Sequence, residues 1–141
     1  MKKIISTNEA PAAVGPYSQA VRAGSIVFCA GQIPLDPKSG KIISQDIGEQ
    51  TRRVLDNITA VLNAEGLTFE QIVKTTIFLT DLGDFQTVNE IYASFFKQAP
   101  PARSTIQVSA LPKGARVEIE AIAMADDSVQ RNAQSVGDTS G

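Results

Sequence analysis

Arg103 is the residue of this 141-residue sequence best suited to hold a small anion. It follows Pro100-Pro101-Ala102, a stiff extended lead-in, and opens a predicted strand. A guanidinium held at the start of a strand can grip a carboxylate through two parallel hydrogen bonds. The same arginine could instead pair with Glu118 or Glu120 on a neighbouring strand, and the pattern alone does not choose between these two roles.

Glu118 and Glu120 are two positions apart in an alternating run, so both side chains point to one face of a strand, roughly 7 Å apart. Carboxylates at this spacing could position a water molecule and move protons. A solvated or ion-paired face is the commoner outcome of the same pattern. If an oligomer buries this face, we expect one carboxylate to have a partner or a raised pKa.

Three further residues could contact a ligand. Tyr17 follows a turn at Gly15-Pro16 and could offer its hydroxyl, although such tyrosines more often serve in packing. Gly31 follows an apolar strand, where a residue without a side chain lets backbone N–H groups approach a ligand. Asn89 lies beside the buried stripe of a predicted helix, where a surface position is the default.

The absences narrow the chemistry further. The sequence has no histidine and one cysteine, which excludes Ser-His and Cys-His dyads, histidine metal sites, cysteine zinc clusters and intramolecular disulfides. No stretch of about 18 apolar residues could span a membrane, so we expect a soluble, cytoplasmic protein. The net charge is −2, and because residues 126–141 hold three Asp and one Arg, residues 1–125 are neutral. Without a basic field, nucleic acid is a disfavoured partner.

The elements that must position these residues follow from hydrophobic periodicity. We predict strands at 17–22, 26–30, 71–80, 103–109 and 115–125, a short strand at 41–43, and two helices that begin after Asp46 and Asp84. Residues 1–16 should form an arm, and residues 1–125 one domain. Residues 126–141 are polar and show no period, so we expect a disordered tail.

This order of elements predicts an α+β fold, in which both helices cover one face of a mixed sheet. On the last two strands, Ile106 and the alternating apolar residues that begin at Val117 should meet the helices. Arg103 and Thr105 should then share the opposite face with the two glutamates. Because two helices cannot cover both faces, we expect the second face to be a subunit interface.

Five segments together closely resemble the RidA/YjgF reactive intermediate deaminase family. They are GPYSQA (15–20), AGQIP (30–34), VNEIY (88–92), PPARST (100–105) and VEIEA (117–121). The match runs from about residue 3 to residue 125. It implies a chorismate-mutase-like fold and a homotrimer that assembles through the uncovered sheet face, with active sites between subunits. It also implies hydrolytic deamination of reactive 2-imino acids and enamines, such as 2-iminopropanoate and 2-iminobutanoate, to 2-keto acids and ammonia.

The resemblance also implies a role for each matching residue. Arg103 matches the arginine that clamps the substrate carboxylate, and Glu120 matches the acidic residue associated with the attacking water. The substrate-binding residues that it implies are Tyr17, Gly31, Asn89 and Thr105. No metal or cofactor is implied, because an imine carbon is already electrophilic and needs only an oriented substrate, a placed water and proton transfer.

Two departures from the family pattern leave other functions open. Ala30 stands where many relatives have Ser, and Thr105 where many have Cys, which affects substrate preference and rate more than reaction type. One alternative function is an endoribonuclease or translation inhibitor. The other is a non-catalytic protein that binds small metabolites or acts as a chaperone.

Overall fold

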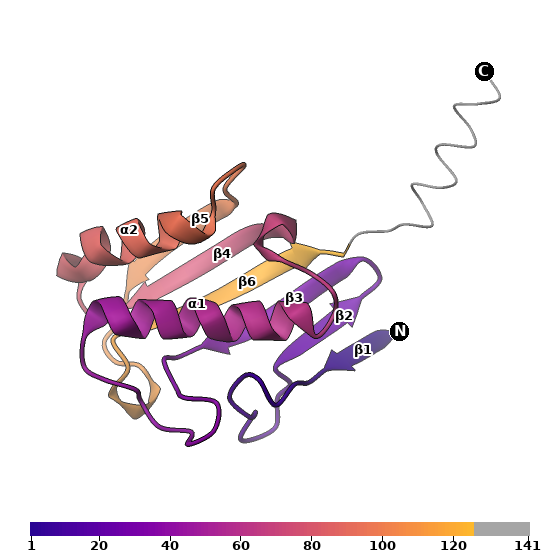
Figure 1. The fold of residues 1–141 in the computed structure, drawn as a ribbon, viewed down its shortest axis with the longest axis horizontal. Helices are drawn as coiled ribbons and strands as arrows, with labels where there is room; N and C mark the ends of the chain where they lie inside the picture. The colour runs from indigo at the N-terminus through magenta and orange to yellow at the C-terminus, as the bar shows by residue number, and fades with distance from the viewer. Residues whose placement is uncertain (126–141) are drawn as a thin grey trace.

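A computed structural model describes residues 1–125 as a six-stranded sheet with two helices on one face (Figure 1). The strands are β1 (Lys2–Ile5), β2 (Ala20–Ala23), β3 (Ile26–Gln32), β4 (Ile72–Leu79), β5 (Ala102–Gln107) and β6 (Val117–Met124). The helices are α1 (Ile47–Asn63) and α2 (Phe85–Phe95), with 3-10 turns η1 (Phe69–Gln71), η2 (Leu82–Asp84) and η3 (Pro112–Gly114). The predicted α+β class is confirmed, whereas the predicted tail lies outside the described residues.

The strand order across the sheet is β1-β2-β3-β6-β4-β5. β4 and β5 run parallel, because α2 forms the crossover between them, and all other neighbouring strands are antiparallel. β6 therefore lies in the middle of the sheet, whereas β5 lies at one edge. β3 carries an irregularity in its pairing with β6 between Cys29 and Gln32, and this bulge shapes the candidate site below.

Helix α1 begins as the sequence predicts. The Asp46 side chain accepts a hydrogen bond from the backbone N–H of Glu49 at 2.8 Å, which satisfies one free donor of the first turn. The Glu49 side chain does not return that bond, and instead accepts one from the hydroxyl of Ser44. Gly66 follows the helix with a φ of 73°, a conformation that favours glycine.

The core lies between the two helices and the sheet. Every second residue of β6, from Val117 to Ala123, is at most 2 % exposed, and α1 buries its apolar stripe against this surface. The stripe consists of Val54, Leu55, Ile58, Val61 and Leu62. Each large aliphatic side chain buried in this way stabilises the fold by about 1.5–3 kcal/mol.

The N-terminal segment departs from prediction. Lys2–Ile5 is an edge strand paired with β2, rather than part of an arm, and the next strand begins only at Ala20. Lysine is a common edge residue because its charge discourages pairing with other chains. The Lys3 ammonium lies 2.8 Å from the Glu65 carboxylate, which fastens the edge to the end of α1. A single bridge between Leu35 and Ile42 occupies the place of the short strand expected at 41–43.

The facing of β5 also corrects a prediction. Arg103 is in register with Thr75 of β4, which is 1 % exposed beneath α2, so Arg103 and Thr105 face the helices. The prediction that they share a face with Glu118 and Glu120 is wrong. β5 pairs with β4 through a parallel crossover and is not adjacent to β6, so a reading of β5 and β6 as neighbours assigned its alternation to the wrong faces.

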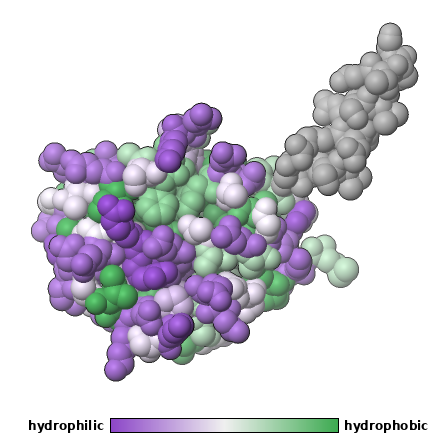
Figure 2. Space-filling model, viewed as in Figure 1, coloured by the Kyte–Doolittle hydropathy of each residue, from purple (hydrophilic) through white to green (hydrophobic). Residues whose placement is uncertain are grey.

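The face of the sheet away from the helices, which we call the open face, is uncovered in the described chain. It exposes four large apolar side chains, each between 36 % and 46 % accessible: Ile26, Phe28, Ile106 and Met124. The helix-bearing side instead presents hydrophilic side chains over much of its surface, with apolar areas between them (Figure 2). An open apolar face of this extent is typical of a subunit contact.

Candidate active site

A cavity of about 570 Å³ opens where residues 7–14, which we call the N-terminal arm from here on, meet β3 and β6. Tyr17 and Gly31, two of the predicted site residues, line it together with Glu118. Apolar side chains form much of the remaining wall, among them Pro11, Val14, Ile33 and Leu35. A cavity with apolar walls and a few polar groups is the usual form of a site for small molecules.

Gly31 makes room for Glu118. A Cβ atom at this position would collide with the Glu118 carboxylate and would lie 2.8 Å from its Cδ atom. The bulge in β3 brings the bare backbone of Gly31 to this place, opposite β6. The glycine therefore serves close packing against a carboxylate, a more specific role than the general backbone access expected from the sequence.

The environment of Glu118 suits a proton acceptor. The side chain is half-buried, and none of the hydrogen bonds within residues 1–125 involves its carboxylate. Burial raises the pKa of Glu118, and the negative charge of Glu120 raises it further. A carboxylate with a raised pKa takes a proton from water more readily than an exposed glutamate does.

Glu120 occupies a different place. It is exposed on the open face, where it borders a separate hollow of about 180 Å³ together with Phe28, Lys74 and Thr76. It does not line the cavity of Tyr17 and Gly31. Both glutamates point to the same face, as predicted, but only Glu118 reaches the cavity.

Arg103 lies on the other side of the sheet, against α2. Its Nη1 donates a hydrogen bond to Oδ1 of Asn89 at 2.8 Å. Its guanidinium carbon lies 5.4 Å from the ring centre of Phe85 and 5.0 Å from that of Tyr92. The alternative of a pairing with Glu118 or Glu120 is therefore not what the structure shows. One amide and two aromatic rings orient the guanidinium, and among residues 1–125 no other hydrogen bond occupies its N–H groups, which can therefore bind an anion.

A hydrogen bond to Thr75 of β4 fixes the ring of Tyr92. Its hydroxyl and that of Thr75 are 2.7 Å apart, and both residues are buried. Burial raises the pKa of the Tyr92 hydroxyl. Thr105, two residues after Arg103, has a buried hydroxyl without a hydrogen-bond partner among the described residues.

The predicted site residues thus form two groups. Arg103, Asn89 and Thr105 belong to the helix-covered side of β5, whereas Tyr17 and Gly31 belong to the cavity with Glu118. The sheet separates the two groups within one chain. A single chain therefore holds a cation site and a carboxylate site that do not face each other.

Comparison with known proteins agrees with this architecture. The family described as Endoribonuclease L-PSP matches residues 7–125. The human 2-iminobutanoate/2-iminopropanoate deaminase is 48% identical over 124 residues, which cover 88% of this chain and 90% of that protein. The crystal structure of the Escherichia coli YjgF gene product superposes with a TM-score of 0.84 at 47% identity, and covers 88% of this chain and 99% of that one.

The chain belongs to the RidA/YjgF family. The resemblance drawn from the five sequence segments is thereby confirmed. A further relative, Protein DfrA of Myxococcus xanthus, is 55% identical over 125 residues, covering 87% of this chain and 95% of its own length.

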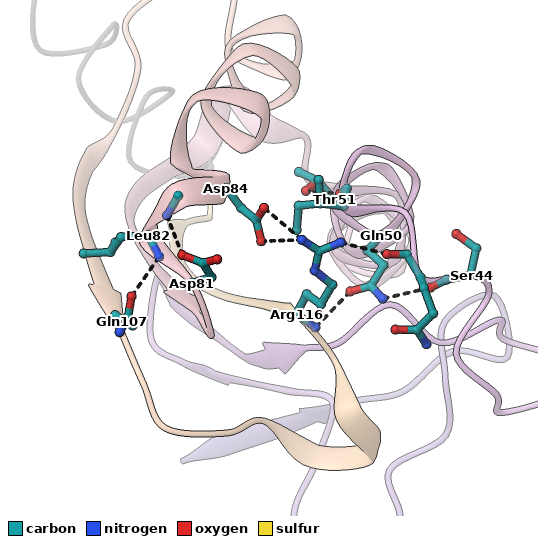
Figure 3. A network of polar contacts seen from close by, with 11 residues as sticks. Ser44, Gln50, Thr51, Asp81, Leu82, Asp84, Gln107 and Arg116 are labelled. Atoms are coloured by element: carbon teal, nitrogen blue, oxygen red, sulfur yellow. Dashed lines mark hydrogen bonds and ion pairs between the residues drawn. The ribbon is translucent and has the colours of Figure 1, made fainter.

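A polar network that sequence reasoning missed connects the elements of this RidA/YjgF fold at the start of β6 (Figure 3). Arg116 donates from Nη2 to the Asp84 carboxylate at 2.8 Å and from Nη1 to the carbonyl of Gln45 at 2.9 Å. The Gln50 side chain accepts a hydrogen bond from the backbone N–H of Arg116 at 2.9 Å and donates one to the Ser44 carbonyl at 2.8 Å. Asp84 precedes α2 as predicted, but its side chain makes no cap hydrogen bond, because it binds Arg116.

Two kinds of feature are absent from residues 1–125. No three His, Cys, Asp or Glu side chains there gather closely enough to hold a metal ion. In the same part of the chain, no helix has the length and hydropathy needed to cross a membrane.

Proposed function

We propose that this protein hydrolyses reactive 2-imino acids, with 2-iminopropanoate and 2-iminobutanoate as substrates, to 2-keto acids and ammonia. The observation that carries the proposal is the half-buried Glu118 carboxylate, packed on Gly31 in an apolar cavity. The name of the human relative, which is 48% identical, supports the same substrate class.

The chemistry needs few groups. Arg103 would bind the substrate carboxylate through its available N–H groups, which orients the imine carbon. Glu118 would take a proton from a water molecule as the water oxygen forms a bond to that carbon and the C=N electrons move to nitrogen. That proton would then pass to the nitrogen, which gives the neutral carbinolamine. Glu118 would next take the hydroxyl proton of the carbinolamine and give it to the amino group. As the C=O bond forms, the C–N bond breaks and ammonia leaves.

Glu118 replaces Glu120 in this assignment. The family role carried over from the sequence placed the water beside Glu120, which is exposed and borders a different hollow. A general base must lie within hydrogen-bond reach of the water that it activates, and that water must lie beside the bound substrate. Of the two glutamates, Glu118 is the one that lines the cavity of Tyr17 and Gly31, where the substrate and this water would lie.

We further propose a homotrimer in which Arg103 of the partner subunit completes the cavity. The separation of Arg103 from Glu118 by the sheet supports this, because one chain cannot bring both groups to one small substrate. The exposed Phe28, Ile106 and Met124 on the open face supply apolar area for the contact. The cytoplasmic location expected from the sequence stays a prediction.

A coupled assay tests the proposal. An amino-acid oxidase generates the imine from L-alanine or L-2-aminobutyrate, and the release of the 2-keto acid is followed with and without the protein. We expect the protein to accelerate release over the spontaneous hydrolysis. An unchanged rate at micromolar protein would refute the activity, and sedimentation analysis in the same buffer would test the trimer.

The family description keeps one alternative in view, because it names an endoribonuclease. Residues 1–125 carry no net charge, which gives RNA little electrostatic attraction. Cleavage of single-stranded RNA that is lost in Arg103→Ala and suppressed by salt would favour this alternative. Binding of 2-keto acids without any turnover would favour a non-catalytic role.

A further inference from the structure

Two buried amide side chains hold walls of the cavity. Gln19, Gln32, Gln50 and Asn57 are the amides that are less than 9% exposed in residues 1–125. A buried amide must find hydrogen-bond partners, because each unpaired polar atom costs about 1–3 kcal/mol. The partners of Gln19 and Asn57 are backbone groups of segments that line the cavity, whereas those of Gln50 are not.

Gln19 fastens the N-terminal arm. Its Oε1 accepts from the Thr7 N–H at 2.7 Å, and its Nε2 donates to the carbonyls of Thr7 at 3.0 Å and Pro11 at 2.7 Å. Within residues 1–125, the hydrogen bonds from other parts of the chain to residues 7–14 all come from this one side chain. Pro11 and Val14 of the arm line the cavity. The position of this wall therefore depends on one amide.

Asn57 fastens a second wall from α1. It is fully buried, and its Nδ2 donates to the carbonyls of Ile33 at 3.3 Å and Leu35 at 3.1 Å. Its Oδ1 accepts from Nε of Arg53 at 3.1 Å, which fixes the orientation of the amide. Ile33 and Leu35 also line the cavity.

The walls so held are apolar, and the charged groups lie elsewhere on the lining. Glu118 is the acidic group there, and Lys113 is the basic one, with its ammonium 3.1 Å from the Gly40 carbonyl. A substrate side chain resting on Val14 and Ile33 gains by being aliphatic, and an acidic side chain would meet the charge of Glu118. The walls thus favour uncharged aliphatic side chains of more than one carbon.

We propose that Gln19 and Asn57 are positioning residues that set the side-chain preference of the enzyme, through the two apolar walls that they hold. This inference rests on the proposed deaminase function. It predicts that longer aliphatic imines depend on both amides, whereas the imine from alanine, with a single methyl group, depends on them little. One methylene in an apolar pocket changes specificity by about tenfold or more, so the effect is measurable.

The test compares kcat/KM for the imines generated from L-leucine and L-alanine. In Gln19→Ala, we expect the leucine-to-alanine ratio to fall about tenfold, with the alanine value within about threefold of wild type. Asn57→Ala should shift the ratio in the same direction. Val14→Ala changes the same wall without a risk of misfolding, because Val14 is 82% exposed. It should lower the leucine-to-alanine ratio of kcat/KM about threefold.

Gln50→Ala is the matched control. It removes an equally buried amide whose partners, Ser44 and Arg116, do not line the cavity. We expect a lower melting temperature and an unchanged ratio. An equal shift in Gln50→Ala, or an unchanged ratio in both Gln19→Ala and Val14→Ala with activity retained, would overturn the wall proposal and leave the deaminase function intact. Absence of wild-type activity on both imines would overturn the function itself, and this inference with it.

Discussion

The two charged groups of the proposed site are held in opposite ways. Arg103 is fixed by side chains: the Asn89 amide binds it, and the rings of Phe85 and Tyr92 lie beside it. Glu118 is placed by backbone instead, because the bulge in β3 brings Gly31 against its carboxylate. The cation has a hydrogen-bond partner, whereas the carboxylate has none among residues 1–125.

This difference matches the two tasks. A group that only binds a carboxylate works best when its geometry is fixed and its charge is permanent, as for an arginine supported on rings. A group that moves protons needs a pKa between that of its donor and its acceptor, and strong hydrogen bonds to its charged form would lower that pKa. Burial without a partner raises the pKa of Glu118. The lack of a partner is therefore useful for catalysis.

The largest effect is expected when the Glu118 carboxylate is exchanged for an amide. Glu118→Gln keeps the size of the side chain but cannot accept a proton, so we expect kcat to fall on the order of 1000-fold. KM should change little, because Arg103 still binds the substrate carboxylate. Steady-state kinetics with the alanine-derived imine measures both. A loss that appears in KM alone would contradict the role of Glu118 in proton transfer.

Removal of the guanidinium should have the next largest effect. Arg103→Ala should lower kcat/KM about 100-fold, since truncation of a charged hydrogen-bond partner costs about 2–5 kcal/mol. Arg103 begins an edge strand and does not fill the core, so the melting temperature should change little. Arg103→Lys, which keeps the charge but loses the fork of donors, should recover only part of the activity. Near-normal turnover by a folded Arg103→Ala would refute the clamp.

Gly31→Ala perturbs the carboxylate through its neighbour. The added methyl group would collide with the Glu118 carboxylate and force it out of its place. Gly31 does not have a positive φ, so the backbone can accept alanine and the fold should persist. We expect kcat to fall about tenfold or more, because small misplacements of a catalytic group are costly. Gly24→Ala, at a turn position with a φ of 62°, strains the backbone but leaves Glu118 untouched, so it should lower the melting temperature and leave kcat unchanged.

Much of this architecture could be predicted from local sequence, and the predictions that were wrong have one cause. The helices and most strands follow from the periodicity of their apolar residues, and the chemistry of Arg103 follows from its type and position. The alternation of a strand separates its residues into two sets, but only pairing shows which set faces the helices, and β5 pairs with β4. The strand at Lys2–Ile5 could not be predicted for a related reason: one of its four residues is buried, which is too few to reveal a period of two.

The choice between Glu118 and Glu120 also depends on strand pairing, which the local sequence does not show. Both residues lie on one face of β6, and nothing local distinguishes them. What distinguishes them lies far away in sequence: Gly31, at the irregular part of β3, lies against Glu118, whereas Glu120 is exposed. The role of Gln19 likewise could not be predicted, because its hydrogen-bond partners lie in a separate segment. A glutamine at the start of an apolar strand is nevertheless a cue to look for buried backbone partners.

The smallest predicted effect concerns the charge of Glu120. Its negative charge raises the pKa of Glu118, so Glu120→Gln should lower that pKa. Glu118 acts in its ionised form, and kcat/KM falls on the acid side as this group becomes protonated. The acid limb of the wild-type profile should lie above the ordinary glutamate pKa of 4.5, and the variant's limb should move to lower pH. On the plateau above the acid limb, the two proteins should agree within about twofold, whereas a uniform large loss across the profile would return the catalytic role to Glu120.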